Sequence, residues 1–389
     1  MPAAASHLRA LLTRGRESGF AFVLGVFLAS RVVLEVVGVL ARTVLWPFVG
    51  ERYVWTYHPS PWWDIWGVLD SGWYLRIAAQ GYLAGSADGQ GSTLAYFPVY
   101  PVLVKALALV TGDALVAGVL LSNLCFLGAL WLLYDLVRAR TDAQVASATV
   151  LLAAFFPGSY VFSSVYTESL FLLLSLASLH YALRDRWGMA GLLGAALTGT
   201  RLLGIAVLAP LALLWVERHG WVSLRRLRGW VRLAPLALVP GGLAAFMLFL
   251  DHLTGDPLAF LHAQAGWDRG FQNPVLAFLT PLWHPTSYNW FQTLFGLVCL
   301  GALVPLARRR LWPELVLALL LLGTPPFNGV PYAPLESYAR YCLVAWPAFV
   351  GLALLLREHG QVRTTVIAML ATLDGLLMAF WATGMLFVM

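Results

Sequence analysis

Residues 20–45 read FAFVLGVFLASRVVLEVVGVLARTVL, and this run is the first of many apolar stretches that together decide the fold. A run of about 20 apolar residues is long enough to cross a bilayer as a helix. Basic residues precede it, as in a secretory signal, but the run is too long for one and no small-x-small cleavage site follows. We therefore expect a retained membrane helix in which Arg31 and Glu35, four residues apart, pair inside the bundle.

The composition of the chain also indicates a membrane location. Hydrophobic residues make up 60% and charged residues 11% of the 389 positions, whereas soluble domains average about 45–50% and about 25%. The net charge of +6 does not indicate a nucleic-acid partner, because the arginines lie between apolar runs, where membrane topology explains them. We expect one integral membrane domain, residues 1–389, in contact with membrane lipids.

The apolar segments predict an all-α, multi-pass membrane protein with about 11 transmembrane helices. A Pro-rich, amphipathic segment at 97–111 is expected to form an interfacial helix that leads into the second span. The candidate spans are 20–45, 113–137, 143–157, 165–183, 187–199, 201–216, 231–252, 289–307, 312–324, 339–356 and 364–388.

The arginines predict the orientation of these spans, because basic residues concentrate on the cytoplasmic side of membrane proteins. Placing the N-terminus in the cytoplasm leaves most of the 25 basic residues there. The loops 46–96, 253–288 and 325–338 then lie outside. They are rich in Trp, Tyr, Asp, His and Pro, so we expect any active site on the extracytoplasmic face of the plasma membrane, or on the luminal face of the endoplasmic reticulum in a eukaryote.

The first outer loop contains the stretch LDSGWYLRIAAQGY, residues 69–82, and two carboxylates, Asp64 and Asp70, among several tryptophans. Asp70 suits the N-cap of a helix that runs from Ser71 to about Gln80 and stops at Gly81. A carboxylate beside aromatic rings is equally suited to bind a sugar or to accept a proton from one. The two carboxylates are about 1.7 helical turns apart and need not share a face.

Four short elements occur in an order that resembles the PIG-V-type, GPI mannosyltransferase II-like family. They are DSGWY at 70–74, YFPVYP at 96–101, YTESLF at 166–171 and the pair Arg340-Tyr341. Each is weak alone, but four in order are fairly specific. One departure is Leu69, where the family usually has Trp.

The resemblance implies a GT-C-like glycosyltransferase with a helical first outer loop. It also implies a polyprenyl-phosphate mannose donor, a glycolipid or glycan acceptor, and inversion at the anomeric carbon. The chemistry of such a donor agrees with a single catalytic carboxylate. A phosphate leaves as an anion without a general acid, so that one base suffices, whereas an inverting glycosidase needs two carboxylates. We expect Asp70 to be that base. The histidines lack metal-ligand spacing, so we expect no cofactor and no metal.

Two arginines, Arg201 and Arg340, are candidates for binding the donor phosphate. Both fall at the outer ends of spans, where the positive-inside rule does not account for basic residues. Guanidinium groups suit phosphate through paired donors, and the hydroxyls of Tyr338 and Tyr341 are expected to assist. The alternative is that these arginines extend to headgroups or pair with Glu168 or Glu336. Glu168 itself suits a helix start, the positioning of Arg201, or acceptor binding.

Further residues are expected to contact substrate, mostly from the outer loops. The expected substrate-binding residues are Asp64, Trp73, Tyr74, Arg76, Tyr100, Tyr166, Glu168, Trp267, His262 and His284.

A membrane transporter or flippase of lipid-linked sugar remains the alternative function. The polar residues, however, gather at the outer surface rather than near the midplane, where transporters place them.

Overall fold

The computed structural model describes residues 2–46, 56–83 and 92–385. Within them almost all regular structure is helical, as the apolar segments predict. A short antiparallel pair of strands, β1 (Gly270–Phe271) and β2 (Asn328–Gly329), joins two of the loops that are expected to lie outside. The all-α fold class is therefore confirmed.

The helices follow one another with short connections. Their bounds are α1 (Pro2–Leu40) continued by η1 (Ala41–Leu45), α3 (Pro61–Asp64), α4 (Ser71–Gln80), η2 (Thr93–Ala95), α5 (Val99–Thr111), α6 (Ala114–Arg140), α7 (Ala143–Phe155), η3 (Ser159–Phe162), α8 (Glu168–Leu183), α9 (Trp187–Thr198), η4 (Leu202–Val207) and α10 (Leu208–His219). The second half contains η5 (Trp221–Arg225), α11 (Leu227–Leu233), η6 (Ala234–Leu238), α12 (Gly241–Thr254), α13 (Ala259–His262), η7 (Ala263–Trp267), α14 (Pro274–Leu279), η8 (Thr280–Leu282), α15 (Ser287–Gly301), α16 (Leu303–Arg308), α17 (Trp312–Gly323), η9 (Pro325–Phe327), α18 (Tyr338–Val344), α19 (Trp346–Leu355) and α20 (Gly360–Ala382).

All eleven apolar segments fold as helices, but they differ in length. Five helices among the described residues are long and apolar enough to cross a membrane, and two bent pairs raise that number to seven. The other expected spans, α7, α8, α9 and α17, are 12 to 16 residues long, which is below the roughly 20 residues of a straight crossing. The count of 11 transmembrane helices therefore stays a prediction.

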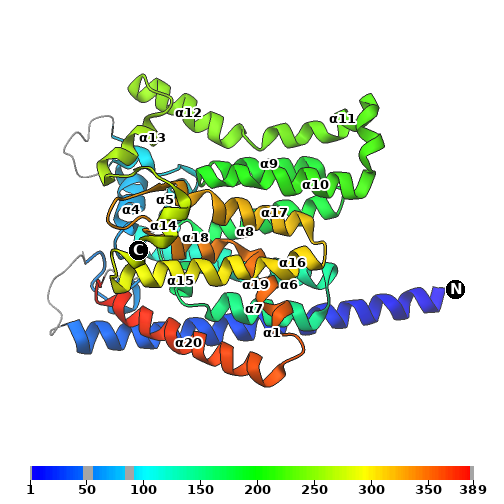
Figure 1. The fold of residues 1–389 in the computed structure, drawn as a ribbon, viewed down its shortest axis with the longest axis horizontal. Coiled ribbons are helices and arrows are strands. Elements are labelled where there is room, and N and C mark those ends of the chain that lie inside the picture. Colours follow the sequence, from blue (N-terminus) through cyan, green and yellow to red (C-terminus); the bar gives the residue numbers. More distant parts are fainter. Residues whose placement is uncertain (1, 47–55, 84–91, 386–389) are drawn as a thin grey trace.

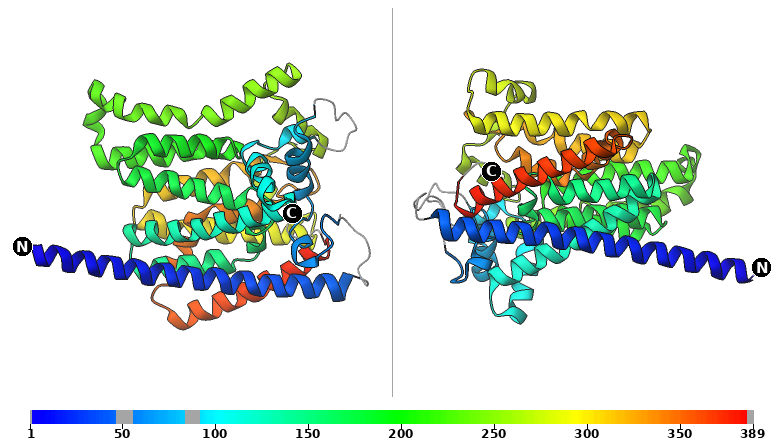
Figure 2. Two further views of the ribbon diagram at one scale, coloured as in Figure 1. Left: turned by 180° about the vertical axis from the view of Figure 1, so that it is seen from behind. Right: turned by 90° about the horizontal axis from the view of Figure 1, so that it is seen from below.

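The long helices lie side by side and give the molecule two ends (Figures 1 and 2). The N-terminus and α11 lie at one end, whereas α4, α13, α14 and the C-terminal end of α20 lie at the other. Ion pairs hold the connections at the α11 end together, and they include Arg140–Glu314, Arg140–Glu217, Arg218–Asp185 and Arg357–Asp142. The basic residues of this end are those that the positive-inside rule assigns to the cytoplasm.

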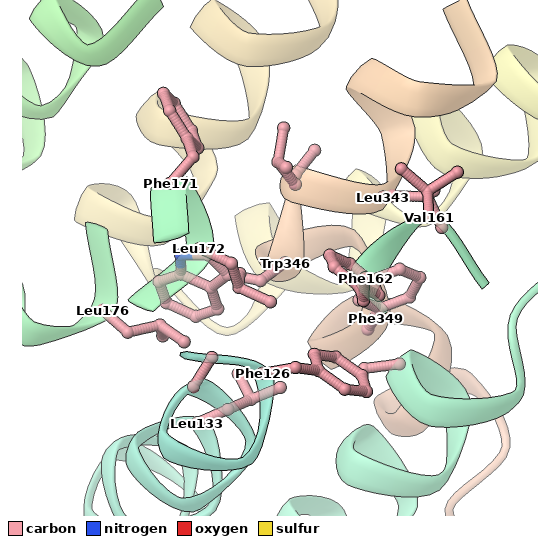
Figure 3. Packing of buried hydrophobic residues seen from close by; sticks show 14 of the residues in the cluster. Phe126, Leu133, Val161, Phe162, Phe171, Leu172, Leu176, Leu343, Trp346 and Phe349 are labelled. Carbon is pink, nitrogen blue, oxygen red and sulfur yellow. The ribbon is translucent and has the colours of Figure 1, made fainter. Parts of the chain in front are cut away.

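The core between the two ends is a tightly packed apolar cluster (Figure 3). Phe126 of α6 stacks on Phe162 of η3, with ring centroids 4.4 Å apart, and Phe349 of α19 packs edge-on against Phe156. Aromatic pairs of this kind add about 0.5–1.5 kcal/mol beyond the burial of their area. The cluster therefore fixes η3 against α6, and the end of α7 against α19.

A buried polar network at the α7–α8 connection corrects one expectation. Arg31 of α1 donates hydrogen bonds to the carbonyl oxygens of Ala154 and Ser159 and to the hydroxyl of Ser159, rather than pairing with Glu35. Asp374 of α20 accepts from the backbone N–H and the hydroxyl of Ser159. Glu35 instead accepts a hydrogen bond from the indole of Trp66. Arg31 and Asp374 thus satisfy the backbone groups that the chain exposes where α7 ends, as buried polar groups require.

Candidate functional site

Asp70 lies at the start of α4, and its side chain faces a polar cluster. Its backbone is helical (φ −58°, ψ −16°), and its carboxylate makes no capping hydrogen bond. Instead, Oδ2 pairs with Nη1 of Arg340 at 2.9 Å, and Oδ1 accepts a hydrogen bond from the Tyr96 hydroxyl at 3.2 Å. The backbone N–H of Asp70 donates to the Tyr166 hydroxyl. The carboxylate is thus oriented by two long-range contacts rather than by its own helix.

The turn before α4 produces this orientation. Leu69 has a positive φ of 56°, a conformation that costs a non-glycine residue roughly 1–2 kcal/mol. The helix itself runs from Ser71 to Gln80, and Gly81 ends it with a φ of 79°. The bounds of this helix therefore match the sequence, whereas the expected capping role of Asp70 does not appear.

Glu168 joins two arginines at the first residue of α8. Its Oε1 accepts hydrogen bonds from Nε of Arg340 at 2.9 Å and from Nη1 of Arg201 at 2.8 Å. The Glu168 side chain is fully buried, and its Oε2 has no hydrogen-bond partner among the residues that the structure describes. The pairing of Arg201 and Arg340 with Glu168, which the sequence left as an alternative, is therefore the arrangement present.

The two arginines differ in the donors that they leave open. Arg340 uses Nε and Nη2 on Glu168 and Nη1 on Asp70, and its guanidinium lies over the Tyr166 ring. Arg201 is bonded only through Nη1 among the described residues, and it lies over the ring of Tyr341, 5.2 Å from its centroid. Arg201 therefore keeps donors available for an anion, whereas Arg340 holds carboxylates in place.

A third arginine, Arg269, reaches the same cluster from the loop after η7. It pairs with Glu336 at 3.1 Å and interacts electrostatically with Tyr341, Asp70 and Arg340. Arg269 lies in none of the four sequence motifs and was not among the predicted site residues. The available signal was its position, since it is a basic residue on a loop expected to lie outside.

Aromatic rings line the cluster beside Asp70. Trp73 stacks on Tyr96 with centroids 5.7 Å apart, and Trp267 meets both rings edge-on at 6.0 and 6.1 Å. Tyr74 packs edge-on against Tyr96 at 5.1 Å. Burial, and then the charge of Asp70, raise the pKa of Tyr96 well above its usual value. Tyr96 therefore stays protonated and donates to Asp70, a role that its place in the motif did not suggest.

Two predicted site residues make their contacts elsewhere. Asp64 is buried, accepts hydrogen bonds from the backbone N–H groups of Tyr57 and His58, and pairs with Arg42 at 3.3 Å. The Tyr338 hydroxyl donates to the carbonyl of Leu322. The contacts of both side chains hold loops and helices together, so their expected roles in substrate binding and phosphate binding stay predictions without a contact to support them.

The remaining predicted residues fall into two groups. Tyr100 and Tyr166 are buried supports: Tyr100 bonds to the Ser122 hydroxyl, and Tyr166 accepts from the Asp70 backbone. Arg76, His262 and His284 are exposed. Among the residues that the structure describes, no group of three or more His, Cys, Asp and Glu side chains gathers as a metal site would.

Comparisons with known proteins give a family and several distant structures. Residues 54–255 match the family described as mannosyltransferase (PIG-V). No individual curated protein matches the sequence. The crystal structure of the Archaeoglobus fulgidus oligosaccharyltransferase tethered with an acceptor peptide is similar over 92% of this chain and 55% of its own, with 12% identity and a TM-score of 0.49.

A second structure of that protein, in complex with an inhibitory peptide and a dolichol-phosphate, is similar over 92% of this chain and 56% of its own. The identity is 14% and the TM-score 0.46. The chain therefore spans about half the length of these solved structures.

Proposed function

Because this chain belongs to the PIG-V family of mannosyltransferases, we propose that it moves a mannosyl residue from a polyprenyl-phosphate donor to a glycolipid or glycan acceptor. Family membership makes the chain a glycosyltransferase, and its long apolar helices make it an integral membrane protein. The donor, the acceptor, inversion and a GT-C-type mechanism without metal are parts of the proposal.

The proposed step needs one base. An acceptor hydroxyl oxygen attacks the anomeric carbon of the donor, and the bond between that carbon and the phosphate oxygen breaks. The electron pair leaves with the polyprenyl phosphate, while the acceptor proton passes to an Asp70 carboxylate oxygen. Attack and departure on opposite faces invert the anomeric carbon. A positioned base of this kind contributes about 10²–10⁴-fold to the rate.

The single observation that carries the proposal is the convergence of Asp70, Glu168, Arg201 and Arg340 from distant parts of the chain. Arg340 and Tyr96 hold the Asp70 carboxylate, which is still 29% exposed. A base must be both fixed and accessible to an acceptor, and Asp70 meets both conditions. Its negative charge also favours the positive charge that develops on the sugar ring.

We assign the donor phosphate to Arg201 and Arg269, because both keep guanidinium donors beyond their bonds to Glu168 and Glu336. Charge-assisted hydrogen bonds to phosphate are among the stronger polar contacts in proteins. Arg340 contributes charge nearby while it positions Asp70. Trp73 and Trp267 offer apolar faces on which the sugar ring can stack.

The proposed side of the membrane rests on the difference between the two ends of the bundle. The end with Arg140, Arg218 and Arg357 suits the cytoplasm, and Asp70 lies at the other end, with α4. We therefore propose that transfer takes place on the extracytoplasmic or luminal face, where a lipid-linked donor can enter from the bilayer.

The test is transfer of labelled mannose from polyprenyl-phosphate mannose to candidate acceptor lipids by the purified protein. Asp70→Asn should lower the rate by at least about 100-fold while donor binding and melting temperature are kept. Asp113→Asn is the matched control, because Asp113 caps α6 and Asn caps a helix equally well. Full activity in Asp70→Asn would refute the assignment of the base. Donor flux across vesicles that continues in this variant without any transfer would indicate the transporter instead.

A further inference from the structure

A cavity that is largely open to solvent lies between residues 92–94 and 254–263, and it has no role in the chemistry proposed above. It has a volume of about 320 Å³, and its lining includes Ser92, Leu94, Thr254, Asp256, His262 and Ala263. Small-molecule sites usually measure about 300–1,000 Å³. The cavity is therefore large enough for a small ligand.

The polar groups of the cavity suit hydroxyl groups. Nδ1 of His262 lies 2.7 Å from Oδ2 of Asp256, and this bond lowers the pKa of the Asp256 carboxyl. The His262 side chain is 68% exposed and that of Asp256 38%, so both reach solvent. Ser92 and Thr254 add hydroxyls, each able to donate and to accept hydrogen bonds.

The charge of the cavity separates it from the phosphate site. Among the described residues that line it there is no arginine or lysine, and Asp256 gives it a negative charge. A phosphate would be repelled there, whereas hydroxyls can donate to the carboxylate and bond to the imidazole. The aliphatic side chains of Leu94 and Ala263 provide apolar surface for the C–H groups of a ring. The lining therefore favours a neutral carbohydrate over the anionic donor.

The two chain segments that line the cavity lead directly to the site. Leu94 precedes Tyr96 by two residues, and Ala263 begins η7, which ends at Trp267. The rings of Tyr96 and Trp267 pack against each other, with centroids 6.1 Å apart, and Tyr96 donates to Asp70. A ligand in the cavity is thus separated from the base by the aromatic rings on which a sugar can stack.

We propose that this cavity is the acceptor subsite, and that it binds a neutral, hydroxyl-rich sugar unit of the acceptor through Asp256, His262, Ser92 and Thr254. The inference rests on the proposed function and adds a second, acid-lined position to it. Asp256 and His262 orient the acceptor here and take no part in bond formation. Their loss should raise the KM for acceptor and leave the KM for donor unchanged.

The test uses p-nitrophenyl α-mannobioside as the acceptor probe and polyprenyl-phosphate mannose as the donor. His262→Ala and Asp256→Asn should each raise the KM for the glycoside at least fivefold, with kcat and the donor KM changed by less than twofold. Ala263→Phe, which fills the cavity, should act in the same direction. His252→Ala and Asp251→Asn are matched controls, because both residues are exposed on α12 and do not line the cavity.

Binding without turnover separates the two proposals. Saturation-transfer NMR with the glycoside alone should show binding to the wild type and to Asp70→Asn, and at least fivefold weaker binding to His262→Ala. Equal binding by wild type and His262→Ala, or no binding by the wild type, would overturn the acceptor subsite. Binding at the cavity without any transfer of mannose would leave the subsite standing and reject the proposed reaction.

Discussion

Two buried arginine networks in this molecule use similar residues, but they differ in how many of their hydrogen-bonding groups have partners within the protein. Arg31, where α1 passes the α7–α8 connection, bonds through every guanidinium nitrogen to seryl oxygens and backbone carbonyls, with Asp374 nearby. At the α4 end, within the described part of the chain, Arg201 keeps donors free, Glu168 has an unpartnered oxygen, and Asp70 is partly exposed. The first network is complete without a ligand, and the second is not.

The difference shows how a buried charge can be assigned to structure or to function. A charged side chain inside a membrane protein suggests a functional site by default, and both networks satisfy that criterion in sequence. The two networks are distinguished only by which of their donors and acceptors have hydrogen-bond partners. This matters because an unsatisfied buried donor or acceptor costs about 1–3 kcal/mol. A site that keeps such groups is suited to a ligand that completes them.

The closed network should give the largest effect on stability. Asp374→Ala leaves the amide groups of Gly158 and Ser159 without their acceptor and removes the carboxylate that interacts electrostatically with Arg31. We expect a loss of about 3–5 kcal/mol, measured as a lower melting temperature in detergent, with Asp374→Asn between it and the wild type. Glu358→Ala, at an exposed position, should change stability by less than about 0.5 kcal/mol. An unchanged melting temperature in Asp374→Ala would show that the Arg31 network does not stabilise the fold, and the contrast between the two networks would fail.

The open network should respond in substrate binding instead. Arg201→Ala removes a proposed charge-assisted contact worth about 1.5–3 kcal/mol, so the KM for polyprenyl-phosphate mannose should rise about 10–100-fold. Arg201→Lys should recover part of that loss, since it keeps the charge without the planar fork. The donor KM of both variants is measured from the rate of transfer over a range of donor concentrations. A fall in melting temperature with an unchanged donor KM would place Arg201 with Arg31, as a structural residue.

The smallest effect is expected at Tyr96, whose hydroxyl orients the Asp70 carboxylate through one hydrogen bond of 3.2 Å, which is long for a hydroxyl that donates to a carboxylate. Tyr96→Phe keeps the ring that stacks on Trp73 and removes the hydroxyl that donates to Asp70. Because this bond is long, we expect it to contribute about 0.5–1.5 kcal/mol, less than a short hydrogen bond to a charged group, so kcat should fall about 3–10-fold with little change in donor KM or stability. A loss as large as that of Asp70→Asn would mean that Tyr96 itself takes part in proton transfer.

Much of the fold could be predicted because its signals are local. The length of the apolar runs predicted the helical segments, and Gly81 with its neighbours predicted α4. Both signals lie in the local sequence and need no contact between distant residues. The pairing of Arg31 with Glu35 was wrong for a physical reason. The two residues are close in sequence on one helix, but the ends of α7 and η3 offer backbone carbonyls that a guanidinium satisfies better.

The candidate site was predicted only in part. Asp70, Arg201, Arg340 and Glu168 were selected from motif and charge, and the structure brings them together. Arg269 was missed because it lies outside the four motifs, and the orienting role of Tyr96 was missed because its contact with Asp70 is made only by the tertiary packing. The positive φ of Leu69 could not be foreseen, since nothing in a leucine favours that conformation.

The sequence by itself determined that this chain is a helical membrane protein with one acidic, aromatic-rich loop, because hydrophobicity and charge act residue by residue. The tertiary structure alone decided which carboxylate is held by an arginine and which arginines keep open donors. Those properties depend on side chains up to 270 positions apart in the chain, whose meeting is fixed by the packing of whole helices.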